Sequence, residues 1–310
     1  MADAAASHER DPAAHRCGFV AILGAPNVGK STLLNRLVGT KVSIVTHKVQ
    51  TTRRRILGIT IKGDAQIVFM DTPGIFTPRQ PLERAMVRAA WAGAEDADLR
   101  VLVVDARHEL DVGTRLILDG LRERGGRTIL AINKLDLVKP PSLLPRIKAF
   151  DETGLFERIF IVAAMTGDGC EDLLNALSRE LPPGPWLFPE DQLSDLSQRG
   201  LAAEITREKL FLQLHQELPY SLTVETEAWT GSEDGREVRI DQTIYVQRAS
   251  QKAIVLGKGG QKIKAVGQAA REELERLLER RVHLFLFVKV REDWPLDPER
   301  YQELGLDHPG

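Results

Sequence analysis

The run Gly24-Ala25-Pro26-Asn27-Val28-Gly29-Lys30-Ser31 decides the fold. It has the form G-x-x-x-x-G-K-S, the phosphate-binding loop, in which backbone N–H groups and the lysine hold phosphates and the serine hydroxyl binds Mg²⁺. An apolar run over residues 18–23 precedes it and predicts a buried strand, and an amphipathic stretch from Leu33 to Val38 follows it. The loop therefore joins a strand to a helix N-terminus, where the helix dipole favours anions. A chance glycine-rich turn is the alternative, and the further motifs argue against it.

The 310 residues are enough for about two domains, and 43% apolar with 28% charged residues is ordinary for a globular protein. The net charge of −2 means that any nucleic-acid site has to be a local basic patch. Apolar runs are too short to span a membrane, and residues 1–14 lack a signal-peptide core, so we expect a cytoplasmic protein with a disordered N-terminal tail. Two cysteines, Cys17 and Cys170, are too few for a disulfide framework and are expected to be buried.

A second motif, Asp71-Thr72-Pro73-Gly74, ends the predicted strand 66–70. An Asp at this place beside a phosphate-binding loop anchors Mg²⁺, normally through water. The Gly74 N–H is placed to bond the γ-phosphate, and residues 75–79 predict a loop that orders with the γ-phosphate and relaxes without it. The pattern D-x-x-G is weak alone and specific after G-x-x-x-x-G-K-S.

A third motif, Asn133-Lys134-Leu135-Asp136, ends the predicted strand 128–132 and selects the base. Guanine offers N1–H and N2–H₂ as adjacent donors to the Asp136 carboxylate, whereas adenine has no 2-amino group. A polar site left unpaired by the wrong base can reject it by about 10⁴–10⁵. Lys134 is expected along the base, and Asn133 is expected to tie this loop to the phosphate-binding loop. A solvated turn is the alternative.

A polar loop over residues 47–55 separates the first predicted helix from a strand near 55–61. Nucleotide switches place a Mg²⁺-binding Thr in such a loop, so Thr51 and Thr52 are both candidates, although Thr pairs before strands are usually solvated. Further strands are predicted at 99–105 and 158–162, with helices at 82–94, 112–124 and 171–181. This alternation indicates a mostly parallel sheet, with ligand sites at the carboxyl ends of its strands.

A proline-rich run over residues 181–189 marks a domain boundary. The order after it is α-β-β-α-α-β, with a helix at 201–214, strands at 220–229 and 237–247, an apolar segment at 254–256, a long helix to about 281 and a strand at 282–290. The buried face of the long helix is expected to carry Ile263, Val266, Ala270, Leu274, Leu277 and Leu278.

A G-x-x-G loop, Gly257-Lys258-Gly259-Gly260, precedes this long helix. In KH domains such a turn lets a nucleic-acid backbone approach while the bases lie along an apolar groove. No acidic residue occurs from Gln242 through Ala270, which makes the window basic. A plain helical turn with solvated lysines is the alternative, and the flanking strands favour nucleic acid. The expected RNA-binding residues are Lys252, Ile254, Leu256, Gly257, Lys258, Gly259, Gly260, Lys262, Ile263 and Lys264.

With these motifs the chain resembles the Era family of bacterial GTPases, in which a Ras-like GTPase domain is joined to a type II KH domain. The resemblance runs from Gly18 to Trp294 and includes Gln50-Thr51-Thr52-Arg53, Arg207-Glu208-Lys209-Leu210, Glu217-Leu218-Pro219-Tyr220-Ser221 and residues 257–264. It implies GTP hydrolysis, binding to small-subunit ribosomal RNA near its 3′ end, a role in assembly and maturation of the small ribosomal subunit, and peripheral association of a monomer with the inner membrane.

The expected architecture is therefore an α/β P-loop GTPase domain with a mostly parallel sheet, followed by a smaller α+β type II KH domain. The expected boundaries are a tail at 1–15, the GTPase domain at 16–182, a linker at 183–198, the KH domain at 199–295 and a tail at 296–310.

The resemblance also assigns the site. It favours Thr52 over Thr51 because Thr52 precedes Arg53, and it implies Mg²⁺ at Ser31, Thr52 and Asp71. The residues expected to support hydrolysis are Asn27, Lys30, Thr52 and Gly74. The residues expected to contact GTP or GDP are Gly24, Ala25, Pro26, Asn27, Val28, Gly29, Lys30, Ser31, Thr32, Asp71, Thr72, Pro73, Gly74, Ile75, Asn133, Lys134, Leu135, Asp136 and Ala164.

Three positions depart from the family pattern. Ala25 replaces a basic residue with little expected effect, and Val49 replaces a proline, so a more flexible switch loop is expected. Ala163 replaces a Ser of the guanine loop, so the Ala164 N–H still meets guanine O6 but a supporting hydroxyl is lost.

Turnover is expected to be slow without help, because Ile75 and Phe76 stand where Ras-type enzymes carry a water-orienting Gln. Asn27 matches a loop Asn that binds K⁺ in some related GTPases, so K⁺ is expected to accelerate turnover. Two alternatives remain open from the sequence: an RNA-binding module with a purely structural nucleotide site, and a GTPase whose second domain is a protein or membrane adaptor.

Overall fold

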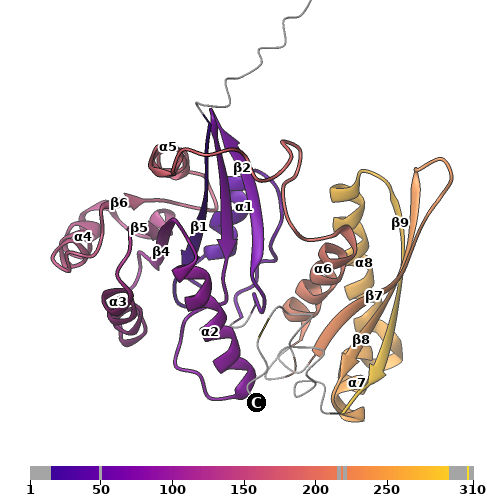
Figure 1. Ribbon diagram of the computed structural model, residues 1–310. Coiled ribbons are helices and arrows are strands. Elements are labelled where there is room, and N and C mark those ends of the chain that lie inside the picture. The colour runs from indigo at the N-terminus through magenta and orange to yellow at the C-terminus, as the bar shows by residue number, and fades with distance from the viewer. Residues whose placement is uncertain (1–14, 49–50, 215–217, 219–221, 293–305, 307–310) are drawn as a thin grey trace, which may run out of the picture.

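The computed structural model describes residues 15–48, 51–214, 218, 222–292 and 306, and Figure 1 shows their arrangement as two units joined by a linker. The expected tails at 1–15 and 296–310 fall almost entirely outside these residues, as does Val49 of the switch loop. Among the helices of the described residues, none combines the length and apolar character that crossing a bilayer requires.

The first unit contains a six-stranded sheet in the order β2-β3-β1-β4-β5-β6. Only β2 runs antiparallel to its neighbour, β3, and the other pairs are parallel. The mostly parallel sheet predicted from the alternation of elements is therefore confirmed. The strands are β1 (Arg16–Leu23), β2 (Ile56–Lys62), β3 (Ala65–Asp71), β4 (Leu99–Asp105), β5 (Thr128–Asn133) and β6 (Arg158–Ile161).

Helices cover both faces of this sheet, and the apolar core is divided accordingly. Leu33 and Leu173 belong to the cluster on one face, whereas Ala90, Ile117 and Phe150 belong to the cluster on the other. Both cysteines lie in these cores, as predicted. The helices are α1 (Lys30–Val38), α2 (Pro81–Glu95), α3 (Val112–Arg124), α4 (Leu143–Asp151) and α5 (Cys170–Glu180).

Helix α4 was not predicted from the sequence. Pro140, Pro141 and Pro145 suggest a loop, yet Pro145 falls in the first turn, where a helix lacks internal N–H partners and tolerates proline. Phe150 anchors the helix in the core at 3% exposure.

The second unit is a three-stranded sheet in the order β7-β8-β9, with β8 antiparallel to β7 and parallel to β9. Two long helices lie on the face of this sheet that is turned toward the first unit (Figure 1). The predicted order α-β-β-α-α-β is confirmed. The elements are α6 (Gln198–Gln213), β7 (Leu222–Gly231), β8 (Glu237–Val246), α7 (Ala249–Leu256), α8 (Gln261–Leu278) and β9 (Arg281–Val290).

The face of α8 is buried as expected at its centre. Val266, Ala270 and Leu274 are almost fully buried. Ile263, Leu277 and Leu278 are only partly buried and pack at the margin of the same core.

The linker runs along the edge of the first sheet. The Ile59 N–H donates to the Leu193 carbonyl at 2.9 Å, and the Leu57 N–H donates to Asp195 Oδ1 at 2.9 Å. The linker therefore occupies hydrogen-bonding groups of β2, an edge strand that would otherwise present them to other chains.

Replacing Gly58 with Ala is expected to destabilise the first unit by about 1–3 kcal/mol, because an added methyl overpacks the contact between β2 and α1. A Cβ at Gly58 would lie 2.6 Å from Leu34 Cδ1 and 2.9 Å from Val38 Cγ2, and both side chains are buried. Thermal unfolding measures the change. Gly231→Ala, at a strand residue with open space around it, is the matched control; equal midpoints for the two variants would contradict the prediction.

Candidate functional site

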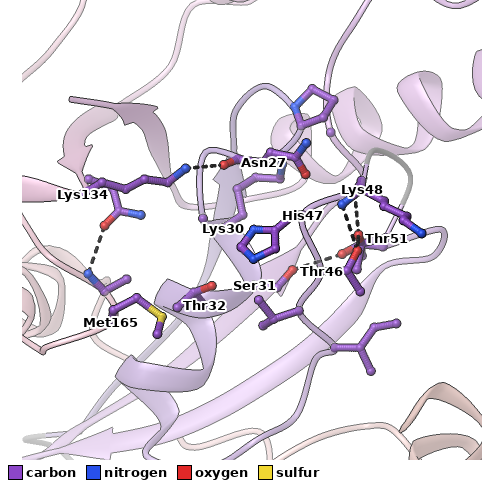
Figure 2. A pocket seen from close by; sticks show the side chains of 18 of the residues that line it. Asn27, Lys30, Ser31, Thr32, Thr46, His47, Lys48, Thr51, Lys134 and Met165 are labelled. Atoms are coloured by element: carbon purple, nitrogen blue, oxygen red, sulfur yellow. Dashed lines mark hydrogen bonds between the residues drawn. The ribbon is translucent and has the colours of Figure 1, made fainter. Parts of the chain in front are cut away.

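A cavity of about 360 Å³ opens at the carboxyl ends of the strands of the first sheet. Figure 2 shows side chains around it from the phosphate-binding loop, from the loop after β5 and from the connection between α1 and β2, called the switch segment below. Lys30, Ser31, Thr52, Gly74 and Asp136 all line it. The predicted contacts that do not line it are Gly24, Ala25, Val28, Asp71, Thr72, Pro73, Ile75 and Leu135.

The phosphate-binding loop has a backbone that only particular residues adopt. Gly24 and Gly29 have φ of +148° and +100°, and Asn27 has φ of +64°. A Cβ at Gly29 would lie 2.3 Å from Asn133 Nδ2, so glycine is needed for the guanine motif to pack against this loop. The loop ends at Lys30, the first residue of α1, which places the helix N-terminus at the cavity.

Lys30 is a buried cation at the base of the cavity. Its side chain is 6% exposed, and its ammonium donates to the carbonyls of Gly24 at 3.1 Å and Ala25 at 3.0 Å. Burial lowers the pKa of Lys30 to about 8, although the nearby Asp71 carboxylate opposes the shift. Phosphate oxygens would restore the full stability of its charged form.

Asp71 gathers three hydroxyl groups on one oxygen. Its Oδ2 accepts from Ser31 Oγ at 2.7 Å, Ser43 Oγ at 2.8 Å and Thr52 Oγ1 at 3.4 Å. Burial raises the pKa of this carboxyl against the effects of Lys30 and the hydroxyls. Its Oδ1 is buried and has no hydrogen-bond partner among the residues that the structure describes. The carboxylate and the hydroxyls of Ser31 and Thr52 are oxygen groups of the kind that Mg²⁺ prefers as ligands.

Ser43 was missed by the sequence analysis. It is 1% exposed between Val42 and Ile44, and its partner Asp71 lies 28 residues away. Because its neighbours are apolar, the segment resembles an ordinary buried core segment, and no local sequence signal identifies the role of Ser43.

The geometry separates the two switch candidates. Thr52 is 7% exposed, and its hydroxyl lies 3.1 Å from that of Ser31. The Thr51 hydroxyl instead donates to the Lys48 carbonyl at 2.7 Å. Of the two, it is therefore Thr52 that is directed at Asp71.

The switch segment is also held by the second unit. Glu208 of α6 accepts from the Val45 N–H at 2.8 Å and from the Lys41 ammonium at 2.7 Å. The Arg207 guanidinium donates to the Thr51 carbonyl at 2.5 Å, and Lys48 donates to carbonyls at the end of α6. The described part of this segment thus lies between the cavity and α6.

The guanine motif is fixed to the phosphate-binding loop as predicted. Asn133 Nδ2 donates to the Val28 carbonyl at 2.9 Å, and its Oδ1 accepts from the Ala164 N–H at 3.0 Å. Lys134 Nζ donates to the Asn27 carbonyl at 2.7 Å, a bond drawn in Figure 2. Asp136 is exposed at the cavity wall, which leaves its carboxylate available to a base.

The guanine loop has a support that the sequence analysis missed. Arg36 of α1 donates from Nε to the Ala164 carbonyl at 3.1 Å and from Nη2 to the Met165 carbonyl. These bonds hold the loop beside Ala163, where the family pattern has a serine hydroxyl.

The second unit carries the G-x-x-G turn between α7 and α8. A Cβ at Gly257 would lie 2.7 Å from Lys262 Cβ, whereas Gly259 and Gly260 face open space. A cavity of about 370 Å³ lies beside α8. It is lined by Ile263, Lys264, Gly267, Gln268, Arg271, Leu284, Phe285 and Leu286.

Only part of the predicted RNA site borders this cavity. Ile263 and Lys264 line it, but Ile254 is 49% exposed on α7 and Leu256 packs against the core. Leu284 and Leu286 of β9 form the opposite apolar wall of the cavity. From the sequence, residues 282–290 were predicted only to be a closing strand. Gly267, Gln268 and Arg271 of α8 also line this cavity and were not among the residues predicted from the sequence.

Known proteins share both units of this chain. A family model described as "50S ribosome-binding GTPase" matches residues 19–134, and one described as "KH domain" matches residues 217–295. GTPase Era of Rhizobium meliloti is 58% identical over 313 residues, covering 100% of both chains, and GTPase Era of Brucella suis is 55% identical, covering 98% of this chain and 97% of its own. The chain belongs to the Era family of GTPases.

Solved Era structures have the same fold. A crystal structure of Era with MgGDPNP and nucleotides 1506–1542 of 16S ribosomal RNA is 39% identical, has a TM-score of 0.88, and covers 94% of this chain and 99% of its own. A variant of Aquifex aeolicus Era bound to GDP·AlF₄⁻ also has a TM-score of 0.88, at 38% identity and with the same shares of the two chains covered. The expected P-loop GTPase and KH architecture is therefore confirmed.

Replacing Asp136 with Asn is expected to weaken GTP binding and improve binding of xanthosine triphosphate, because the xanthine 2-oxo group then faces an amide donor. The carboxylate that pairs with guanine can contribute a preference for GTP over other nucleotides of at most about 10⁴–10⁵, and the variant loses this preference. Competition between the two nucleotides in an equilibrium binding assay measures the reversal. Unchanged GTP affinity in the variant would remove Asp136 from the base site.

Proposed function

We propose that the chain is a GTP-hydrolysing switch that binds small-subunit ribosomal RNA near its 3′ end and assists assembly and maturation of the small ribosomal subunit. The observation that carries this proposal is the single cavity that brings together Lys30, the hydroxyls on Asp71 and the guanine-reading Asp136. Family membership and the basic G-x-x-G unit support the RNA-binding part.

In the proposed reaction the protein positions the phosphates of GTP and stabilises their negative charge. Lys30 and the helix N-terminus hold the phosphates, and the Gly74 N–H bonds the γ-phosphate. Ser31 and Thr52, with Asp71 behind them, would hold Mg²⁺, which would supply positive charge to neutralise the phosphates.

Intrinsic turnover is proposed to be slow because the position after D-x-x-G is apolar and inward-facing. Ile75 is 1% exposed in the core, and its N–H donates to the Gly24 carbonyl at 3.1 Å. Its side chain is unsuited to orient water. We assign the missing charge stabilisation to K⁺ bound at Asn27, which lines the cavity and is exposed.

The RNA is proposed to follow the G-x-x-G turn into the cavity between α8 and β9. Lys258 stands at the turn, while Lys262 and Lys264 begin α8, and unstacked bases would lie between Ile263 and the leucines of β9.

We further propose the domain boundaries given above, a GTPase domain at 16–182 and a KH domain at 199–295, for a monomer that acts in the cytoplasm. Peripheral attachment to the inner membrane belongs to the same proposal. Two separate family-model matches, at residues 19–134 and 217–295, support the division into these two domains.

Phosphate release is expected to be faster in K⁺ than in Na⁺ at equal ionic strength, because a K⁺ ion at Asn27 adds positive charge at the γ-phosphate. Asn27→Gly keeps a residue that tolerates φ of +64° and removes the ligand, so the difference between the two salts should vanish. Equal rates for the parent protein in both salts would leave Asn27 as a loop residue only. No phosphate release in either salt would indicate a structural nucleotide site.

Lys258→Asp with Gly259→Asp is expected to abolish binding to an RNA that matches the 3′ tail of the small-subunit ribosomal RNA, with GTP binding intact. Gly259 has φ of +60° and open space, which Asp tolerates. Fluorescence anisotropy of a labelled oligonucleotide measures the loss. Binding by the parent should also weaken with salt at a slope of about −0.7 per phosphate contact.

The matched control is Gly231→Asp with Arg236→Asp, which makes the same change in charge at the β7–β8 turn. In Figure 1 this turn lies at the end of the sheet away from α7. This control variant should bind the RNA as tightly as the parent protein does. If the Lys258 and Gly259 variant binds as tightly as the parent, the RNA site lies elsewhere and the second unit is a protein adaptor.

A further inference from the structure

Asp105, the last residue of β4, lies beside the nucleotide site but in none of the three GTPase motifs. It is 7% exposed, and β4 pairs with β5 so that Asp105 is the register partner of Asn133. The next residue, Ala106, donates its N–H to the Asn133 carbonyl at 2.7 Å. The guanine motif therefore begins directly against the end of β4.

The Asp105 carboxylate is bonded to the second residue of that motif. Its Oδ2 accepts from Lys134 Nζ at 2.7 Å, and the same ammonium donates to the Asn27 carbonyl at 2.7 Å. The Lys134 ammonium thus connects β4, the guanine motif and the phosphate-binding loop at one point, and Figure 2 shows the Lys134 side chain extended toward Asn27.

Arg107 holds the carboxylate in place from the other side. Its backbone N–H and Nε donate to Asp105 Oδ1 at 2.9 Å and 3.0 Å, and its Nη2 donates to Oδ2 at 2.7 Å. Burial alone would raise the pKa of Asp105, but the bonds from Arg107 and Lys134 outweigh it and hold the pKa well below its usual range. The group is therefore a fixed anion at every physiological pH.

A fixed anion can hold the Lys134 ammonium in one place. The Lys134 ammonium ends a flexible four-carbon stem and is strongly hydrated in water, so one neutral carbonyl holds it weakly. Side-chain ordering is costly for lysine, and a charge-assisted bond offsets that cost. The stem of Lys134 is the part expected to lie along the base.

We propose that Asp105 is a positioning residue of the nucleotide site, which fixes the Lys134 ammonium in the bridge between the guanine motif and the phosphate-binding loop. This inference rests on the proposed assignment of the cavity to GTP. It predicts a role in affinity for every purine nucleotide that the site accepts, because the stem of Lys134 contacts the base face and does not read its edge.

Asp105→Asn keeps the size of the side chain and removes its charge. The dissociation constants for GTP and GDP should both rise by about tenfold, through faster release. The ratio of GTP to xanthosine triphosphate affinity should stay unchanged, in contrast to Asp136→Asn. Dissociation of a fluorescent GDP analogue and equilibrium competition measure these effects.

Asp111→Asn is the matched control on the same connection between β4 and α3. Asp111 caps α3 by accepting from the Thr114 N–H at 2.7 Å, and Asn is equally good at such a cap. This variant should bind nucleotide as the parent does. Equal losses in the two variants would mean that the loop as a whole, and not the bond to Lys134, supports the site.

A double-mutant cycle with Lys134→Met separates positioning from general stability. If Asp105 acts through the Lys134 ammonium, Asp105→Asn should cost nothing further once that ammonium is gone. Additive losses would overturn the inference even if the variant were less stable. If the parent binds GTP and Asp105→Asn binds it equally well, the inference alone fails; if the parent does not bind GTP, the proposed function fails first.

Discussion

The buried carboxylate of Asp71 is the constraint on which the nucleotide site depends. One of its oxygens gathers hydroxyls from the start of α1, from the beginning of the switch segment and from its end, through Ser31, Ser43 and Thr52. A carboxylate with no exposed surface needs such partners, because an unpaired buried charge is costly. These partners come from separate segments of the chain, so the carboxylate at the end of β3 also brings Ser31 and Thr52 together beside the cavity.

The switch segment satisfies two sets of partners at once. On one side Thr52 faces Asp71, and on the other the preceding carbonyl of Thr51 accepts from Arg207. Lys41 at its beginning is bound by two carboxylates of the second unit, Glu208 and Glu273. Any displacement of this segment therefore breaks bonds to α6 and α8 as well as to the nucleotide site, and the linker along β2 keeps the two units connected beside it.

Most of the fold and much of the site were predictable because the informative signals are local. The phosphate-binding loop needs positive φ at Gly24 and Gly29, and the sequence supplies glycine there. The residues that were missed act across the chain. Arg36 supports a loop 128 residues away, Asp105 bonds to a lysine 29 residues away, and the β9 wall of the second cavity is identified only once β9 is paired with β8. The alternation of strands and helices and the spacing of motifs carry no information about such contacts. Helix α4 was not predicted because of its prolines, which the first turn of a helix tolerates.

The burial of the two cysteines makes the chain unusually convenient for spectroscopy. Cys17 and Cys170 are 7% and 4% exposed, and burial raises the pKa of both thiols, that of Cys170 to about 11. Only the thiolate reacts with maleimides, so at neutral pH the burial that raises these pKa values also makes both thiols poorly reactive. Dyes can therefore be attached to a pair of cysteines introduced on the surface, one in each unit, with the native thiols left in place. The distance between the two units can then be measured from the two dyes in single molecules whose sequence is otherwise unaltered.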